Sequence, residues 1–168
     1  MLQTVKTTAV VYYSRTGHSK DAATEIADTL GAQRFRLTVD RYHGPRLGYL
    51  TAGFDSLRQR LPQLTSPQPA LRGFQAIVFC APVWTSYPAT PMRRFLRDHP
   101  VLPGVVGLFL TCGDDSEPAK AFEMAQADLG RSFQARGYLP DALARTPGGQ
   151  QRVTEFCAAL QALVKTAV

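Results

Sequence analysis

Val10-Val11-Tyr12-Tyr13-Ser14-Arg15-Thr16-Gly17-His18-Ser19-Lys20 is the most informative segment of the sequence for the fold. It begins as an apolar run of β-branched and aromatic residues, which is typical of a strand, and changes abruptly into a hydroxyl-rich loop. Apolar residues then recur at steps of three and four, which predicts a helix; they are Ala22, Ala23, Ile26, Ala27 and Leu30. A strand, a polar loop and a helix in this order direct backbone N–H groups and a helix N-terminus at a phosphate.

The loop from Ser14 to Ser19 is rich in donors for an anion. Ser14, Thr16 and Ser19 each carry a hydroxyl, and the loop amides add further donors. Gly17 lacks a Cβ, which suits a close backbone approach or an unusual φ. A hydrogen bond to a charged group contributes about 1.5–3 kcal/mol and a helix terminus about 0.3–1 kcal/mol, so donor geometry should dominate binding. The same residue types also favour an ordinary helix N-cap, which is the alternative interpretation of this loop.

Other phosphate-binding loops do not match this segment. The sequence has no G-x-x-x-x-G-K-(S/T) and no G-x-G-x-x-G, which argues against a P-loop and a dinucleotide loop. A receiver domain would need acidic residues after the first strand, which here ends in Tyr13-Ser14. The loop instead resembles the first loop of the flavodoxin family, (S/T)-x-T-G-x-(S/T), which cradles the phosphate of FMN. The resemblance implies that the phosphate is bound by Ser14, Arg15, Thr16, Gly17, His18 and Ser19.

A second apolar run ends at Pro82 and predicts a buried parallel strand. Pro88 or Pro91 can open the next helix, so an aromatic loop lies at the carboxyl edge of the sheet, where ligands bind in open α/β folds. The loop resembles the family's second flavin loop, P-x-(W/Y)-x-x-x-P, which holds the isoalloxazine ring. The resemblance implies that Trp84 or Tyr87 stacks on the ring; the alternative is that both are core or rim aromatics. The implied cofactor-binding residues are Pro82, Val83, Trp84, Thr85, Ser86 and Tyr87.

The third segment runs from Val105 to Ser116 and is again an apolar strand that ends in a glycine-bearing polar loop. Ser116 is predicted to cap the following helix, with Glu117 and Pro118 in its first turn. The segment resembles the family's third flavin loop, (T/G)-x-G-D, whose backbone hydrogen-bonds the ring edge. The resemblance implies that the cofactor is contacted by Thr111, Cys112, Gly113 and Asp114.

The remaining pattern predicts a single domain over residues 1–168. Its length and 45% hydrophobic content allow a sizeable core. Alternation from Gln33 to Val39, and Pro140 within Tyr138 to Leu143, predict two edge strands. Two further helical faces are predicted, formed by Phe122, Leu129 and Phe133 and by Val153, Phe156, Cys157, Leu160 and Val164. We expect an α/β fold with a doubly wound five-stranded parallel sheet, flavodoxin-like order 2-1-3-4-5, and helices on both faces.

Residues 40–64 have little periodicity and many turn residues. A short helix is predicted from Asp55 to Leu61, before Pro62. Long irregular runs in compact domains are usually binding loops, lids or mobile segments. Two interpretations stay open for the aromatic residues here, which either roof the flavin ring or pack the loop down; these residues are Tyr42, Tyr49 and Phe54.

The sequence favours a cytoplasmic protein. Met1 to Lys6 is polar and precedes a strand, so no leader is expected, and no apolar run approaches the roughly 20 residues of a membrane span. The cysteines show no metal-binding spacing. Cys80 and Cys157 are expected in the core, whereas Cys112 would lie beside the flavin, with a redox role the less favoured interpretation. No metal site is expected, because the three histidines are scattered; they are His18, His43 and His99.

The net charge of +6 separates this chain from electron-shuttling flavodoxins, which are generally acidic. Arginines gather in Arg34 to Arg60 and in Arg93 to Arg97. Positive charge near a flavin raises its reduction potential, since a charge pair a few Å apart contributes about 1–4 kcal/mol. It would also attract anionic partners or the phosphates of NAD(P)H. Nucleic acid is not expected, because no basic tract is present. The plain alternative is a solvated basic surface without a partner.

Two functions follow from the resemblance. The first is an FMN-dependent reductase that passes electrons from NAD(P)H to a quinone or similar small acceptor, with no catalytic side chain of its own. The second is a carrier that docks on a redox partner protein without turnover. A domain that has lost FMN is disfavoured by the intact first loop. Basic charge and the aromatic segment over 40–64 favour the reductase, and the oligomeric state is not predicted.

Overall fold

Six strands form the sheet of the computed structural model, which describes residues 7–98 and 101–167. Five are parallel in the order β2-β1-β3-β5-β6: β1 Thr8–Tyr12, β2 Gln33–Arg36, β3 Ala76–Trp84, β5 Val105–Cys112 and β6 Ala135–Pro140. This confirms the predicted order of five parallel strands. The sixth, β4 (Tyr87–Pro88), pairs antiparallel with the end of β3 and was not predicted.

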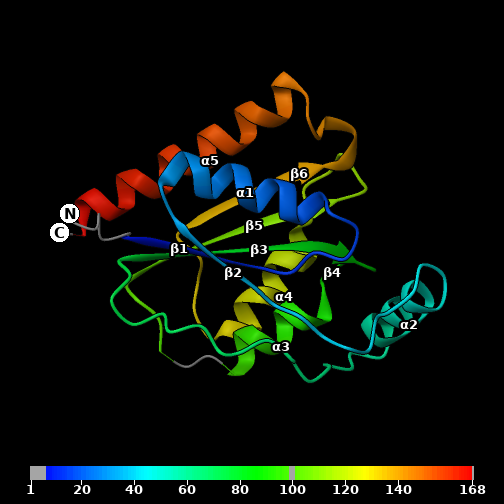
Figure 1. Ribbon diagram of the computed structural model, residues 1–168. Coiled ribbons are helices and arrows are strands. Elements are labelled where there is room, and N and C mark those ends of the chain that lie inside the picture. Colours follow the sequence, from blue (N-terminus) through cyan, green and yellow to red (C-terminus); the bar gives the residue numbers. More distant parts are fainter. Residues whose placement is uncertain (1–6, 99–100, 168) are drawn as a thin grey trace.

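Helices cover both faces of the sheet (Figure 1). Helices α1 (His18–Leu30) and α5 (Pro147–Thr166) pack together on one face, and α3 (Thr90–Asp98) and α4 (Ala119–Leu129) on the other. Helix α2 (Leu47–Leu57) belongs to neither layer and lies beyond the carboxyl end of the sheet, at the right of Figure 1. A short 3₁₀ turn, η1 (Asp141–Leu143), follows β6.

The strands alternate between two buried cores, because successive side chains of a strand point to opposite faces. Val10 of β1 packs in the core under α1 and α5, with Ile26 and Phe156. Its neighbour Val11 packs in the core over α3 and α4, with Phe95. Both faces of β1, β3 and β5 are therefore apolar, which explains the continuous hydrophobic runs in the sequence.

The terminal helix shows how local chemistry sets an element boundary. The Thr146 side chain accepts a hydrogen bond from the Gly149 N–H, and Pro147 occupies the first helical position, where a missing N–H costs little. The predicted apolar face of this helix is confirmed, since Val153, Phe156 and Leu160 are buried.

Several predicted boundaries are wrong. The helix expected from Asp55 to Leu61 is α2, which begins and ends earlier. Helix α4 begins at Ala119 after Pro118, not at Ser116, and ends before Phe133, which is buried in the loop that follows. The edge strands are β2, which stops at Arg36, and β6, which begins at Ala135.

Met1 to Lys6 and His99 lie outside the described residues. Within the described part, no helix combines the length and hydropathy needed to cross a bilayer. The same part of the chain contains no group of three or more side chains suited to hold a metal ion.

Candidate functional site

A pocket of about 510 Å³ opens at the carboxyl ends of β1, β3 and β5. Its volume lies in the range of small-molecule sites, and its position is the one where open α/β sheets bind ligands. All three predicted loops reach it; the predicted residues that line it are Arg15, Thr16, His18, Pro82, Val83, Trp84, Thr85, Thr111, Cys112 and Gly113. The remaining lining residues are Tyr49, Ala52 and Gly53 of α2 and Asp141 of η1.

The other predicted residues do not line this pocket; they are Ser14, Gly17, Ser19, Ser86, Tyr87 and Asp114. Two of them shape its first loop. The Ser14 Oγ accepts the Gly17 N–H at 3.1 Å, which closes the turn. The buried Ser19 Oγ lies 2.6 Å from Thr111 Oγ1 and ties the start of α1 to β5. Tyr87 lies under Lys120, whose Nζ is 4.6 Å from the ring centroid.

The first loop ends in a helix terminus that no side chain caps. Gly17 stands at the N-cap of α1 with φ of 111°, a backbone conformation that favours glycine. The first N–H groups of a helix have no acceptor within the helix, so those of α1 are left for another group. The Thr16 side chain is exposed at the same place. The loop therefore presents an uncapped helix end and a hydroxyl to the pocket, as an anion site requires.

Arg15 brings a positive charge to this loop. Its Nη2 donates to the Pro45 carbonyl at 3.0 Å and to the Gly44 carbonyl at 3.3 Å, and its guanidinium carbon lies 5.5 Å from the centroid of Tyr49. These contacts fasten the segment before α2 to the loop. Its Nε is the one buried side-chain nitrogen or oxygen that has no hydrogen-bond partner in the described ranges. An unpaired charged donor beside an uncapped helix end is a second indication of an anion site.

Trp84 forms an aromatic wall of the pocket. Its ring packs edge-to-face against Tyr13, at 5.6 Å between centroids, and against Tyr42, at 5.4 Å. Tyr42 is buried and does not line the pocket, and Phe54 is exposed on α2. Of the three residues considered as a roof, the structure places only Tyr49 at the pocket.

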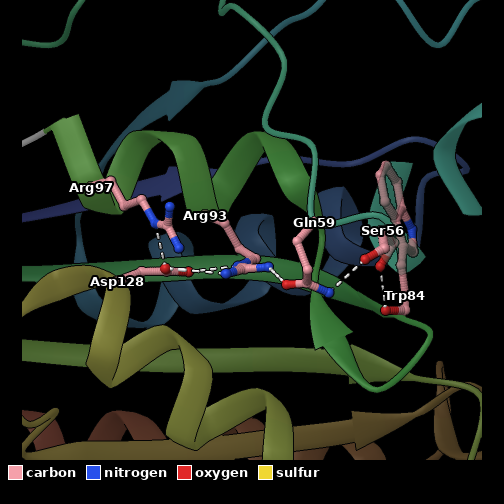
Figure 2. A network of polar contacts seen from close by, with 6 residues as sticks. All are labelled: Ser56, Gln59, Trp84, Arg93, Arg97 and Asp128. Carbon is pink, nitrogen blue, oxygen red and sulfur yellow. Dashed lines mark hydrogen bonds and ion pairs between the residues drawn. The ribbon is translucent and has the colours of Figure 1, made fainter. Parts of the chain in front are cut away.

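A polar network behind the pocket holds Trp84 and its loop (Figure 2). Ser56 Oγ donates to the Trp84 carbonyl at 2.8 Å, and Gln59 Nε2 donates to the Ser56 carbonyl at 2.7 Å. Arg93 in turn donates to Gln59 Oε1, and its Nε donates to Asp128 Oδ2 at 2.6 Å. The chain of contacts runs from α4 through α3 to the end of α2 and the tip of β3, so these four elements are fixed to one another.

The turn between β3 and β4 has a strained backbone. Trp84 pairs with Tyr87, and the two residues between them, Thr85 and Ser86, have φ of 49° and 71°. Two-residue hairpins of this kind need positive φ at both positions, which a β-branched threonine disfavours. Since the one Ser56 hydrogen goes to the Trp84 carbonyl, Thr85 Oγ1 donates to Ser56 Oγ, 2.6 Å away. The Ser56 hydroxyl thus holds the strained turn at the pocket wall.

Asp55 anchors the inner face of α2. It is buried, pairs with Arg41, and accepts the Tyr42 hydroxyl at 3.0 Å; Tyr42 in turn accepts from Thr90 at 2.8 Å. Hydrogen bonding to Arg41 holds the pKa of the Asp55 carboxyl below its ordinary value, against the opposing effect of burial. Burial raises the pKa of Tyr42, so its hydroxyl remains a donor.

The pH dependence of stability should contain a contribution from Asp55. Because its pKa is lower in the folded than in the unfolded chain, the stabilisation is present above the unfolded value of about 4 and is lost as pH falls toward the folded value. We expect Asp55→Asn to unfold more easily at about pH 7 and to lose less stability on acidification below about pH 4. Thermal unfolding measured from about pH 7 to below about pH 4 tests this expectation, with a substitution of the exposed Asp40, Asp40→Asn, as the control. Parallel pH profiles of Asp55→Asn and the unsubstituted protein would contradict the assignment.

Cys112 lines the pocket, but its thiol is not activated. Burial raises its pKa, and its Sγ donates to the Asp114 carbonyl at 3.2 Å. Since the thiolate is the reactive form, the environment does not favour nucleophilic or redox chemistry at this residue. Cys80 and Cys157 are buried in the core, as predicted, and burial raises the pKa of each to about 12.

His18 and Asp141 meet at the pocket rim. The His18 Nδ1 lies 3.0 Å from Asp141 Oδ1, and both side chains are about half exposed. Asp141 was missed by the sequence analysis. The available signal was its position directly after an edge strand, at the sheet end where the other pocket loops gather.

Comparison with solved structures shows the flavodoxin-like fold. A flavoprotein from Lactobacillus acidophilus, crystallised in complex with FMN, matches with a TM-score of 0.71 and 18% identity over 90% of this chain and 99% of that chain. A short-chain flavodoxin associated with a non-canonical PDU bacterial microcompartment matches at 0.55 and 15%, over 94% and 98%. Rubredoxin oxygen:oxidoreductase from Desulfovibrio gigas matches at 0.59 and 10%, over 95% of this chain and 36% of that protein. No protein-family model and no curated protein matches the sequence.

Proposed function

We propose that this chain binds FMN without a covalent bond and acts as a flavodoxin-like oxidoreductase. One observation carries the proposal: a single pocket at the carboxyl edge of the sheet is lined both by an uncapped, hydroxyl-bearing loop and by the aromatic Trp84. FMN has the matching parts, a phosphate and a flat aromatic ring. The fold, which is shared with a flavoprotein crystallised with FMN, supports the same assignment.

The phosphate end would be held by the first loop. Thr16 offers its hydroxyl, Arg15 its unpaired Nε, and the first turn of α1 its free N–H groups. The hydroxyls of Ser14 and Ser19 also shape the loop, through Gly17 and Thr111. The Ser14 hydroxyl accepts in its contact, so its hydrogen remains available to a phosphate. The backbone N–H groups of both serines remain part of the proposed phosphate site.

The ring end would be held by the second and third loops. Trp84 is the candidate for stacking, because it lines the pocket, whereas Tyr87 does not. Pro82, Val83 and Cys112 supply further apolar surface. Bound FMN would supply electron transfer, and the chain's own residues bind it, orient it and exclude water from one side. No side chain is assigned as a general acid or base.

The finer proposal is a reductase that takes electrons from NAD(P)H and passes them to a quinone or a similar small acceptor. The net charge of +6 and the arginines close to α2 support an anionic donor such as NAD(P)H. The experiment measures NADH and NADPH oxidation by FMN-loaded protein with and without a water-soluble quinone. Oxidation that depends on the quinone and on loaded FMN supports the reductase. If neither NADH nor NADPH reduces the bound FMN, but a chemical reductant does, the protein is a carrier instead.

A further inference from the structure

The solvent-facing side of α2 carries an apolar surface. In residues 7–98 and 101–167, six large apolar side chains are exposed, and all but Val101 belong to α2. The α2 residues are Leu47, Tyr49, Leu50, Phe54 and Leu57, between 47 and 76% exposed. Contiguous exposed apolar surface of this kind marks an interaction site on soluble proteins. We call these five residues the α2 surface.

The α2 surface is exposed because the helix packs on the rest of the domain through the side that carries its small residues. Gly48, Ala52 and Ser56 are buried, and a Cβ at Gly48 would lie 2.6 Å from the Tyr42 carbonyl oxygen. Leu47, Leu50, Phe54 and Leu57 follow one another at steps of three, four and three, so they form one stripe along the opposite side of the helix. The amphipathic pattern is thus reversed, with the larger apolar side chains facing water.

Arginines frame this stripe. Arg46 precedes α2, and Arg58 and Arg60 follow it, with guanidinium carbons 5.1 Å and 5.8 Å from the Phe54 ring centroid. None of the three takes part in an ion pair within the described part of the chain. The acidic residue of α2, Asp55, is buried and paired with Arg41. The surface is therefore apolar and cationic at once.

We propose that α2 docks this protein on an anionic phospholipid surface. Apolar side chains enter the boundary between headgroups and acyl chains, and arginines meet the lipid phosphates, as in interfacial amphipathic helices. Tyr49 has the aromatic body and polar tip that suit this boundary. No acid lies on the α2 surface, and the amide of the neighbouring Gln59 is engaged by the Ser56 carbonyl and by Arg93, so a fluid headgroup layer fits better than a shaped partner.

A second copy of the chain fits the same surface less well. Packing α2 against its symmetry mate would bring the unpaired Arg46, Arg58 and Arg60 of both copies together. Like charges brought close at an interface oppose association. An anionic lipid surface instead supplies the missing counter-charge, which favours it as the occupant.

Docking through α2 would bring the pocket close to the bilayer, because three residues of this helix also line the pocket: Tyr49, Ala52 and Gly53. This consequence rests on the proposed function, because it presents a bound flavin to an acceptor dissolved in the membrane. The docking itself needs no flavin, so it is measured on both apo and FMN-loaded protein.

The test is sedimentation with vesicles of phosphatidylglycerol and phosphatidylcholine in equal amounts, compared with pure phosphatidylcholine. We expect binding to the anionic vesicles only. The double variant Leu50→Glu with Leu57→Glu should bind these vesicles at least tenfold more weakly, and Arg58→Ala and Arg60→Ala about fivefold more weakly each. The controls are Val101→Glu, which changes the exposed apolar residue outside α2, and Arg72→Ala, on an exposed loop; both should bind as before.

Three outcomes would overturn the proposal. The first is equal binding to neutral and anionic vesicles. The second is a loss of vesicle binding in the Val101→Glu control as large as that in the α2 variants. The third is no vesicle binding at all; if light scattering then shows a dimer that Leu50→Glu disrupts, a second copy covers α2. FMN retention is measured on the same samples, so failure to dock and failure to bind flavin are seen separately.

Discussion

Thr16→Asp should weaken FMN binding by at least about a hundredfold while leaving riboflavin affinity within about twofold. The exposed Thr16 side chain stands at the uncapped end of α1, where the phosphate would lie. A carboxylate there would face the phosphate a few Å away, and two like charges at about 4 Å repel by roughly 4 kcal/mol at the surface of a protein. Riboflavin has no phosphate, so it would not meet this repulsion. Titration by flavin fluorescence measures both ligands.

The milder Thr16→Ala removes the hydroxyl without adding charge. The loss of one hydrogen bond to a charged group, about 1.5–3 kcal/mol, should weaken FMN at least about tenfold. The control is Thr154→Asp, which adds the same charge on an exposed turn of α5. Equal losses for FMN and riboflavin in either Thr16 variant would show that the first loop does not hold the phosphate.

Asp128→Ala should lower the free energy of unfolding by about 3–5 kcal/mol, a large share of the stability of a typical domain. Both side chains of the Arg93–Asp128 pair are about 1% exposed, and Arg93 Nε and Nη2 donate to the two carboxylate oxygens. Removal of Asp128 leaves the buried guanidinium with Gln59 as its polar partner (Figure 2). Because an unpaired buried charge is far costlier than a broken surface pair, the effect should be large. Urea unfolding provides the measurement.

Two variants separate the buried charge from simple loss of contacts. Arg97 also donates to Asp128 but is about half exposed, so Arg97→Ala should cost no more than about 1 kcal/mol. Replacing both members of the buried pair, Arg93→Met with Asp128→Leu, should recover much of the stability lost in Asp128→Ala, since neither charge then remains buried. A loss below about 1 kcal/mol for Asp128→Ala, or no recovery in the double variant, would contradict this account.

The layout of the sheet could be predicted because it depends on patterns that lie close together in the sequence. Each of the segments ending at Ser14, Pro82 and Thr111 has a continuous apolar run followed by a polar loop, and the parallel sheet places these loops at one edge. The convergence of three loops on one pocket follows from that topology.

Helix α2 was placed wrongly although its large apolar residues recur at helical steps of three and four. Turn residues before and within the segment, such as Gly44, Pro45 and Gly48, hid this spacing. The large apolar residues Leu47, Leu50 and Leu57 face water, and the small Gly48 and Ala52 face the body. No side chain caps its N-terminus, so the usual signals of a helix boundary are also missing. Of the three aromatic residues weighed as a roof or as packing for the loop, Tyr42 packs in the core, Phe54 is exposed on α2, and Tyr49 lies at the pocket.

The polar network behind the pocket could not be predicted from the sequence either. Arg93 and Asp128 are 35 residues apart, and an arginine beside Arg94 and Arg97 is typical of a solvated helix face. Only tertiary packing shows that one arginine of the three is fully buried. The same holds for Ser56, whose contact with Trp84 joins segments that share no sequence motif.

The most direct test of the central claim is a titration of apo protein with FMN, followed by desalting and a visible absorption spectrum. We expect saturable binding of one FMN per chain, a flavin spectrum that survives desalting, and weaker retention of riboflavin. A protein that stays colourless after exposure to excess FMN, while its folded state is intact by circular dichroism, would contradict the proposed function.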